Sequence, residues 1–160
     1  MTRAIEALSP RELLALAVHV ERANAARFRA FADVFRGYDS KVAARFEELA
    51  AEEQQHEAML TTRFAARFPG PIPTVREADV NGIVESVDME DAEHLIFDTL
   101  KPVQVYDLAL RAERGARDFY RQATAAAKDA ELAALYQELA DMEKDHQAWL
   151  EERMKDPERR

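Results

Sequence analysis

Two Glu-x-x-His motifs are the residues of this sequence best suited to chemistry. They are Glu53 with His56, in "EEQQHEAML", and Glu143 with His146, in "LADMEKDH". Residues three apart on a helix are neighbours on its surface, so each motif can present a carboxylate and an imidazole to one metal ion. Both motifs lie on apolar stripes at helical spacing, which predicts that all four side chains point into a core.

A lone glutamate on an apolar stripe precedes each motif. Glu21 precedes the first motif and Glu113 precedes the second, at nearly equal separations along the chain. The order of one inward glutamate followed by an inward Glu-x-x-His therefore occurs twice. The sequence predicts an internal repeat that supplies six inward-facing metal ligands.

Burying these carboxylates needs a compensating charge. An ionised carboxylate in a dry core costs several kcal/mol even after relaxation. Two divalent ions carry as many positive charges as the four glutamates carry negative ones, so we interpret the six residues as a dinuclear metal site. The alternative is a metal-free helical interaction domain whose inward carboxylates are protonated or salt-bridged.

The available ligand types limit the choice of metal. The chain contains no cysteine, which excludes thiolate ligands, a zinc ribbon and disulfides. Oxygen and nitrogen ligands suit iron or manganese. Ferritin-like di-iron and di-manganese bundles use this donor set, with one Glu from each of two helices and Glu-x-x-His from each of the other two.

Four long helices are predicted to position these ligands. The chain of 160 residues has only 4 Gly and 6 Pro, a composition that favours helices over turn-rich sheets. Ser9, Asp39 or Ser40, and Asp129 are suited to cap helix N-termini, and the break "PGPIP" prevents the second helix from continuing. The predicted helices span residues 10–36, 41–68, 101–127 and 130–155.

A long crossover separates the second helix from the third. Residues 69–88 lack clear periodicity, whereas "MEDAEHLIFDTL", residues 89–100, is predicted to form a short helix. Such a connection lets helices 41–68 and 101–127 run parallel. We expect an all-α, ferritin-like four-helix bundle that forms one domain over residues 1–160.

Charge and hydropathy exclude several kinds of partner. The formal net charge of −9 and the absence of a basic cluster give no support to nucleic-acid binding. No apolar stretch approaches the roughly 18 residues of a membrane span, and the first residues do not form a secretion signal. We expect no membrane span and a cytoplasmic location.

Residues around the motifs are predicted to have supporting roles. Phe28 and Tyr120, each seven residues after a lone glutamate, are expected to pack against the site, with Tyr120 able to hydrogen-bond a ligand carboxylate. Glu52 is expected to be a solvated charge, and Asp141 is the residue to test as an outer partner of a ligand histidine. Two further histidines are not assigned to the metals: His19 and His94.

At these residues the chain resembles the ferritin-like superfamily and, more narrowly, the rubrerythrin family. Four features carry the resemblance: Glu21, "EEQQH" at 52–56, "AERGARDFY" at 112–120 and "LADMEKDH" at 139–146. The resemblance implies a carboxylate-bridged di-iron centre (Fe–O–Fe), with manganese as the alternative metal. By residue match, Glu53 and Glu143 are the bridging, catalytic carboxylates, and the terminal ligands are Glu21, His56, Glu113 and His146.

The resemblance also implies an activity and partners. The expected reaction is oxidation of Fe(II) coupled to reduction of hydrogen peroxide or dioxygen, with a separate electron-donor protein as a partner. A homodimer is expected to form through apolar crossover residues: Ile83, Val84, Leu95, Ile96 and Phe97.

The chain departs from rubrerythrins at two points. It has no cysteine-ligated rubredoxin domain, and Leu110 stands where rubrerythrins carry an additional glutamate. "LSPRELLALAVHVE" and "RFPGPIP" are similar to the ferritin-like domain of membrane-bound ferritins. The alternative function is therefore an iron-binding or sensing module that passes iron to a partner without turnover.

Overall fold

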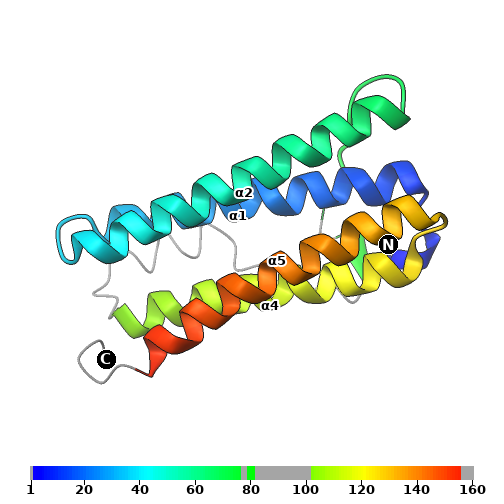
Figure 1. The fold of residues 1–160 in the computed structure, drawn as a ribbon. Coiled ribbons are helices and arrows are strands. Elements are labelled where there is room, and N and C mark those ends of the chain that lie inside the picture. The colour runs from blue at the N-terminus through cyan, green and yellow to red at the C-terminus, as the bar shows by residue number, and fades with distance from the viewer. Residues whose placement is uncertain (1, 77–78, 82–101, 156–160) are drawn as a thin grey trace.

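Two antiparallel helical hairpins form the bundle. The computed structural model describes residues 2–76, 79–81 and 102–155. In the first hairpin α1 (Pro10–Phe35) packs along α2 (Ser40–Arg67), and in the second α4 (Pro102–Ala126) packs along α5 (Ala130–Met154). Figure 1 shows that α2 and α4 run in the same direction, as do α1 and α5. The all-α four-helix bundle and the parallel arrangement that the crossover predicts are both confirmed.

The helix boundaries agree with those predicted because local side-chain caps set them. Ser9 and Glu12 form a capping box before α1, in which the Glu12 N–H donates to Ser9 Oγ over 3.2 Å and the Ser9 N–H donates to Glu12 Oε2 over 2.9 Å. Asp39, rather than Ser40, caps α2 by accepting from the N–H groups of residues 41 and 42, each over 3.1 Å. Asp129 caps α5 by accepting from the Leu132 N–H over 2.9 Å.

A short parallel strand pair ties the N-terminal segment to the start of the crossover. Residues Arg3–Ala4 (β1) pair with Val80–Asn81 (β2), and a 3₁₀ turn, Ile5–Ala7 (η1), leads from β1 toward α1. Sequence reasoning missed this pair because two residues carry no periodicity. The expected helix at 89–100 and the apolar crossover residues Ile83, Val84, Leu95, Ile96 and Phe97 lie outside the described residues.

The break after α2 is held against the start of α1 by Arg11. Its guanidinium donates to the carbonyl oxygens of Pro69 and Pro71, over 3.3 and 2.8 Å, and lies 5.7 Å from the centre of the Phe64 ring. Between these carbonyls Gly70 adopts φ 85°, a left-handed conformation that residues with a Cβ disfavour.

The buried apolar side chains form two clusters at opposite ends of the bundle. One combines residues up to Val20 of α1 with the C-terminal parts of α2 and α4 and the first part of α5. The other is rich in aromatic rings, among them Phe35 and Phe46 with centroids 5.7 Å apart. On each of the four long helices a stretch with polar buried residues separates the two clusters. None of the described helices has the length and hydropathy of a membrane span.

The two glycines on either side of α2, Gly37 before it and Gly70 after it, provide a matched stability test. Gly70→Ala is expected to lower the free energy of unfolding by about 1–2 kcal/mol, because alanine is strained at this positive φ. Gly37 has no left-handed φ, and an added Cβ there meets nothing within 4 Å. Gly37→Ala is therefore expected to raise the free energy by about 0.4–1 kcal/mol. Urea denaturation of both variants measures the difference, and equal effects would contradict this account of the Gly70 turn.

Candidate metal centre

Six polar side chains from all four long helices meet between the two apolar clusters. The four glutamates are fully buried, and His56 and His146 are 9% and 4% exposed. Each helix supplies its residues from the face that also packs into the core. The structure thus brings together all six residues predicted from the sequence: Glu21 from α1, Glu53 and His56 from α2, Glu113 from α4, and Glu143 and His146 from α5.

The six side chains form two overlapping groups. In each group one ligand atom per residue can be chosen so that all of them lie within 4.8 Å of one another. Glu53 and Glu143 belong to both groups. The first group adds Glu21 and His56, and the second adds Glu113 and His146.

The two shared carboxylates each turn one oxygen toward each imidazole. Glu53 Oε2 lies 3.5 Å from Nδ1 of His56, and its Oε1 lies 2.9 Å from Nδ1 of His146. For Glu143 the corresponding distances, from Oε1 and Oε2, are 3.8 and 3.7 Å. A carboxylate with its oxygens directed to two neighbouring positions is arranged to bridge two metal ions.

The other two glutamates each face a single histidine. Glu21 Oε2 lies 3.3 Å from Nδ1 of His56, and Glu113 Oε2 lies 3.4 Å from Nδ1 of His146. The two imidazole rings are nearly parallel, with centroids 6.2 Å apart and an interplanar angle of 14°. The cluster therefore follows the repeat of the sequence, with one Glu–His pair on each side of the shared carboxylates.

Seven atoms of the cluster lack hydrogen bonds. Both oxygens of Glu53, Glu113 and Glu143, together with Nδ1 of His146, are buried without a hydrogen-bond partner. The 2.9 Å approach of Glu53 Oε1 to His146 Nδ1 is short, but it does not have hydrogen-bond geometry. Buried polar atoms left unpaired are costly. Two cations placed in the two groups would satisfy these atoms, so the residues present fit a dinuclear metal centre.

Burial favours the protonated form of three of the four carboxyl groups. Burial, together with the charge of Glu53, raises the pKa of Glu21 to about 8. Burial also raises the pKa of Glu113, and burial with the charge of Glu113 raises that of Glu143 well above its usual range. Burial acts on Glu53 in the same direction, but the close approach of Glu21 and the two histidines outweighs it, so the pKa of Glu53 is lowered.

The imidazoles are held in their charged form by the same carboxylates. Burial lowers the pKa of His56, but hydrogen bonding and the charges of Glu21 and Glu53 outweigh it and raise the pKa to about 10. Burial lowers the pKa of His146, but the nearby carboxylates of Glu113, Glu143 and Glu53 outweigh burial and raise it. Near neutral pH the metal-free cluster is therefore protonated at ligand atoms that a metal ion needs.

Tyr120 forms a hydrogen bond with one of the clustered carboxylates. Its hydroxyl donates a hydrogen bond to Glu21 Oε1, from a fully buried position on α4. The predicted hydrogen bond from Tyr120 to a carboxylate of the cluster is thus confirmed. Phe28 is also fully buried, within the aromatic cluster, and its ring lies 6.0 Å from that of Phe46.

Glu52 is a partner of the cluster that sequence reasoning missed. It was expected to be a solvated charge, and its side chain is 42% exposed, but its Oε2 lies 2.7 Å from Nε2 of His146. The expectation for Asp141 is wrong, because its Oδ1 accepts from Gln137 Nε2 on the exposed surface of α5. The spacing of residues along α2 does not predict the contact of Glu52, because its partner, His146, lies on α5. His94 lies outside the described residues.

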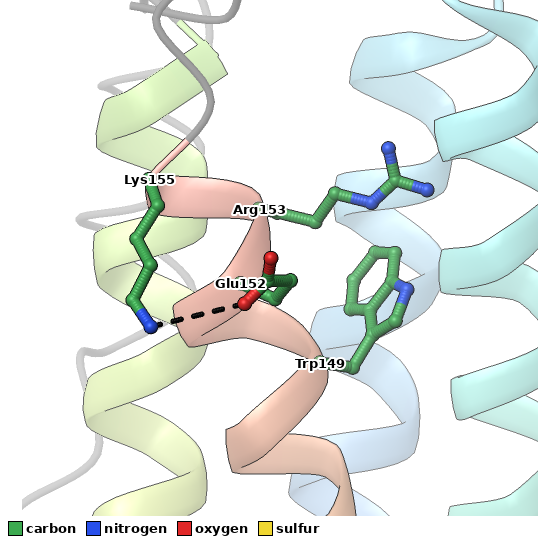
Figure 2. A pocket seen from close by; sticks show the side chains of 4 residues that line it. All are labelled: Trp149, Glu152, Arg153 and Lys155. Carbon is green, nitrogen blue, oxygen red and sulfur yellow. Dashed lines mark ion pairs between the residues drawn. The ribbon is translucent and has the colours of Figure 1, made fainter.

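A surface pocket at the C-terminal end of α5 contains none of the six residues. Figure 2 shows its lining, in which the Arg153 guanidinium lies 5.3 Å from the Trp149 ring centre and Lys155 Nζ lies 3.8 Å from Glu152 Oε2. The lining residues include no histidine and only one carboxylate, so they do not form a metal-binding group. The buried cluster is therefore the candidate functional site.

Metal binding is expected to release protons and to strengthen as pH rises. Protons on Glu21, with a pKa of about 8, and on His56, with a pKa of about 10, compete with metal ions. Raising the pH toward these values removes the competition, so metal affinity should increase from pH 6 to pH 8. Calorimetry in buffers of different ionisation enthalpy measures the protons released. An affinity that falls over this range would contradict the protonated metal-free cluster.

Comparisons with known proteins agree with the four-helix fold and identify the family. The rubrerythrin family model matches residues 12–96 and 105–160. A search of curated proteins found no match. Among solved structures, an uncharacterised conserved protein from Magnetospirillum magnetotacticum is similar, with a TM-score of 0.73 at 21% identity over 92% of this chain and 94% of that one. A hypothetical protein from Pyrococcus furiosus gives a TM-score of 0.64 at 24% identity over 95% and 94% of the two chains. These two structures support the fold, and the family match over most of the chain shows that this protein belongs to the rubrerythrin family.

Proposed function

We propose that this protein is a di-iron carboxylate oxidoreductase that oxidises Fe(II) and reduces hydrogen peroxide or dioxygen. The observation that carries the proposal is the pair of fully buried carboxylates, Glu53 and Glu143, each with one oxygen toward each side of the cluster. A carboxylate pair shared in this way is suited to two metal ions rather than one.

Each side of the cluster would hold one ion. Glu21 and His56 would be the terminal ligands on one side, and Glu113 and His146 on the other, with Glu53 and Glu143 as bridges. Two Fe(II) ions, when bound, would supply the two electrons needed to convert one hydrogen peroxide and two protons into two water molecules. The ligand types are equally compatible with manganese.

The protein's own residues keep the reaction in a dry, fixed site. The apolar clusters on both sides exclude bulk water, which strengthens the electrostatic attraction between the carboxylates and the cations. The Tyr120 hydroxyl fixes the orientation of Glu21 through Oε1. Glu52 Oε2 can hold the Nε2 proton of His146, and its partly exposed side chain connects that proton to solvent.

The reaction can be followed by anaerobic loading with two equivalents of Fe(II) and addition of hydrogen peroxide. We expect rapid oxidation of both ions, seen as new ferric absorption in the near ultraviolet, and repeated turnover when a chemical reductant or electron-donor protein is supplied. Oxidation limited to one stoichiometric event would favour the non-turnover iron-binding module. A loaded protein that does not react with peroxide or dioxygen would refute the oxidoreductase.

Metal should also stabilise the fold, because it binds only the native arrangement of the ligands. At a metal concentration about 100 times Kd the gain is about 2.7 kcal/mol, which corresponds to a rise in Tm on the order of 5–10 °C. Glu53→Ala is expected to abolish this rise, since Glu53 is shared by both ions. Glu47→Ala is the matched control, because Glu47 lies on the same helix in an exposed ion pair with Arg36 at 2.7 Å. Thermal melts with and without Fe(II) or Mn(II) measure the effect, and equal Tm values for the native protein would argue against the metal centre.

A further inference from the structure

We propose that the two metal positions are not equivalent, and that the first ion binds between Glu113 and His146. We call the site formed by this pair and the shared carboxylates the Glu113 position. The site formed by Glu21, His56 and the same shared carboxylates is the Glu21 position. The inference rests on the proposed metal centre and concerns the order in which it is filled. Two independent differences between the sides carry it.

The first difference is the outer partner of each histidine. Both imidazoles turn Nδ1 into the cluster, which leaves Nε2 to bond elsewhere. Nε2 of His146 lies 2.7 Å from Glu52 Oε2, whereas the contacts of His56 with described carboxylates are made through Nδ1. A carboxylate that accepts from the outer nitrogen fixes the tautomer and ring orientation and makes the inner nitrogen a stronger ligand. This contact favours the Glu113 position.

The internal repeat explains why only one histidine has this partner. Glu52 directly precedes the bridging Glu53, and the residue that directly precedes the bridging Glu143 is Met142. Met142 is partly buried and packs against the first apolar cluster. A thioether cannot replace a carboxylate as a charged acceptor, so the repeat is broken at this position.

The second difference is the number of oxygens that each terminal glutamate can give to a metal ion. Both oxygens of Glu113 lack hydrogen-bond partners, so this carboxylate can bind through both. Glu21 Oε1 accepts from the Tyr120 hydroxyl, which leaves Oε2, on the side of His56, as its available oxygen. The repeat equivalent of Tyr120 is Phe28, seven residues after Glu21, and its ring has no hydroxyl to engage Glu113.

Both differences favour the same side. The Glu113 position has a carboxylate with two free oxygens and a histidine fixed by Glu52, whereas the Glu21 position has a carboxylate engaged by Tyr120 and a histidine whose contacts with described carboxylates are made through Nδ1. Outer-partner contacts of this kind change metal affinity by roughly 10–100-fold. The Glu113 position therefore retains its ion, and the Glu21 position is the one at which iron exchanges.

Crystallography of the partly loaded protein identifies the first position directly. Crystals grown with one equivalent of Co(II), which is not oxidised by air at such sites, are measured at the cobalt absorption edge. We expect one anomalous peak between Glu113 and His146, and a second peak between Glu21 and His56 only with excess Co(II). Equal peaks at one equivalent, or a first peak at the Glu21 position, would overturn the inference while leaving the dinuclear centre intact.

Three variants assign the difference in affinity to its causes. In calorimetric titration with Co(II), Glu52→Gln should weaken the tighter step by roughly 10–100-fold and leave the weaker step unchanged. Tyr120→Phe, which makes the residue match Phe28, should tighten only the weaker step. Glu47→Gln, on the surface of the same helix as Glu52, should change neither step.

The remaining outcomes separate the inference from the proposed function. Equal weakening of both steps by Glu52→Gln would show a general effect on the bundle and would overturn the positioning role of Glu52. The absorption spectrum of bound Co(II) gives a second measurement, since loss of the His146 contact should alter the spectrum of the first ion but not of the second. Absence of Co(II) at both positions, even in excess, would refute the metal centre and the proposed function with it.

Discussion

Burial of four carboxylates at one level of a helical bundle is the constraint on which the rest of this structure depends. An apolar core with unpaired negative charge is unstable, so these groups must be neutralised by protons, by the two histidines or by cations. Without metal, protons provide this neutralisation, because the pKa values of three of the glutamates and of both histidines are raised: Glu21, Glu113, Glu143, His56 and His146. Cations bound at the same atoms provide the alternative, which links metal binding to proton release and to stability.

The bundle meets this constraint by dividing its core. Apolar side chains gather in two clusters at opposite ends, and the polar layer lies between them on every long helix. The aromatic cluster fills one end with buried, stacked rings such as Phe35 and Tyr106, whose centroids are 5.6 Å apart. Packing on both sides can therefore hold the six ligands in place even though their mutual repulsion opposes folding.

The two halves of the chain contribute matching residues to the cluster, whereas the residues around the cluster differ between the halves. Each half supplies one glutamate that belongs to a single group, one glutamate shared by both groups and one histidine, which gives the cluster its near-symmetry. Around them, Tyr120 corresponds to Phe28 and Glu52 corresponds to Met142, so the two sides differ in hydrogen bonding. The same residue types are thus repeated within the cluster, whereas the neighbouring positions make its two sides differ.

The sequence by itself determined the helices and the identity of the six clustered residues, because both depend on local order along one helix. Caps at Ser9, Asp39 and Asp129 act within a few residues, and the spacing of Glu53 and His56 places both on the apolar face of α2. Only the tertiary structure decided which residues from different helices meet. The contact of Glu52 with His146, that of Tyr120 with Glu21, and the pairing of β1 with β2 depend on the rotation and relative height of elements far apart in the chain. Periodicity within a single helix does not specify these quantities, which is why Glu52 was missed and Asp141 was wrongly favoured.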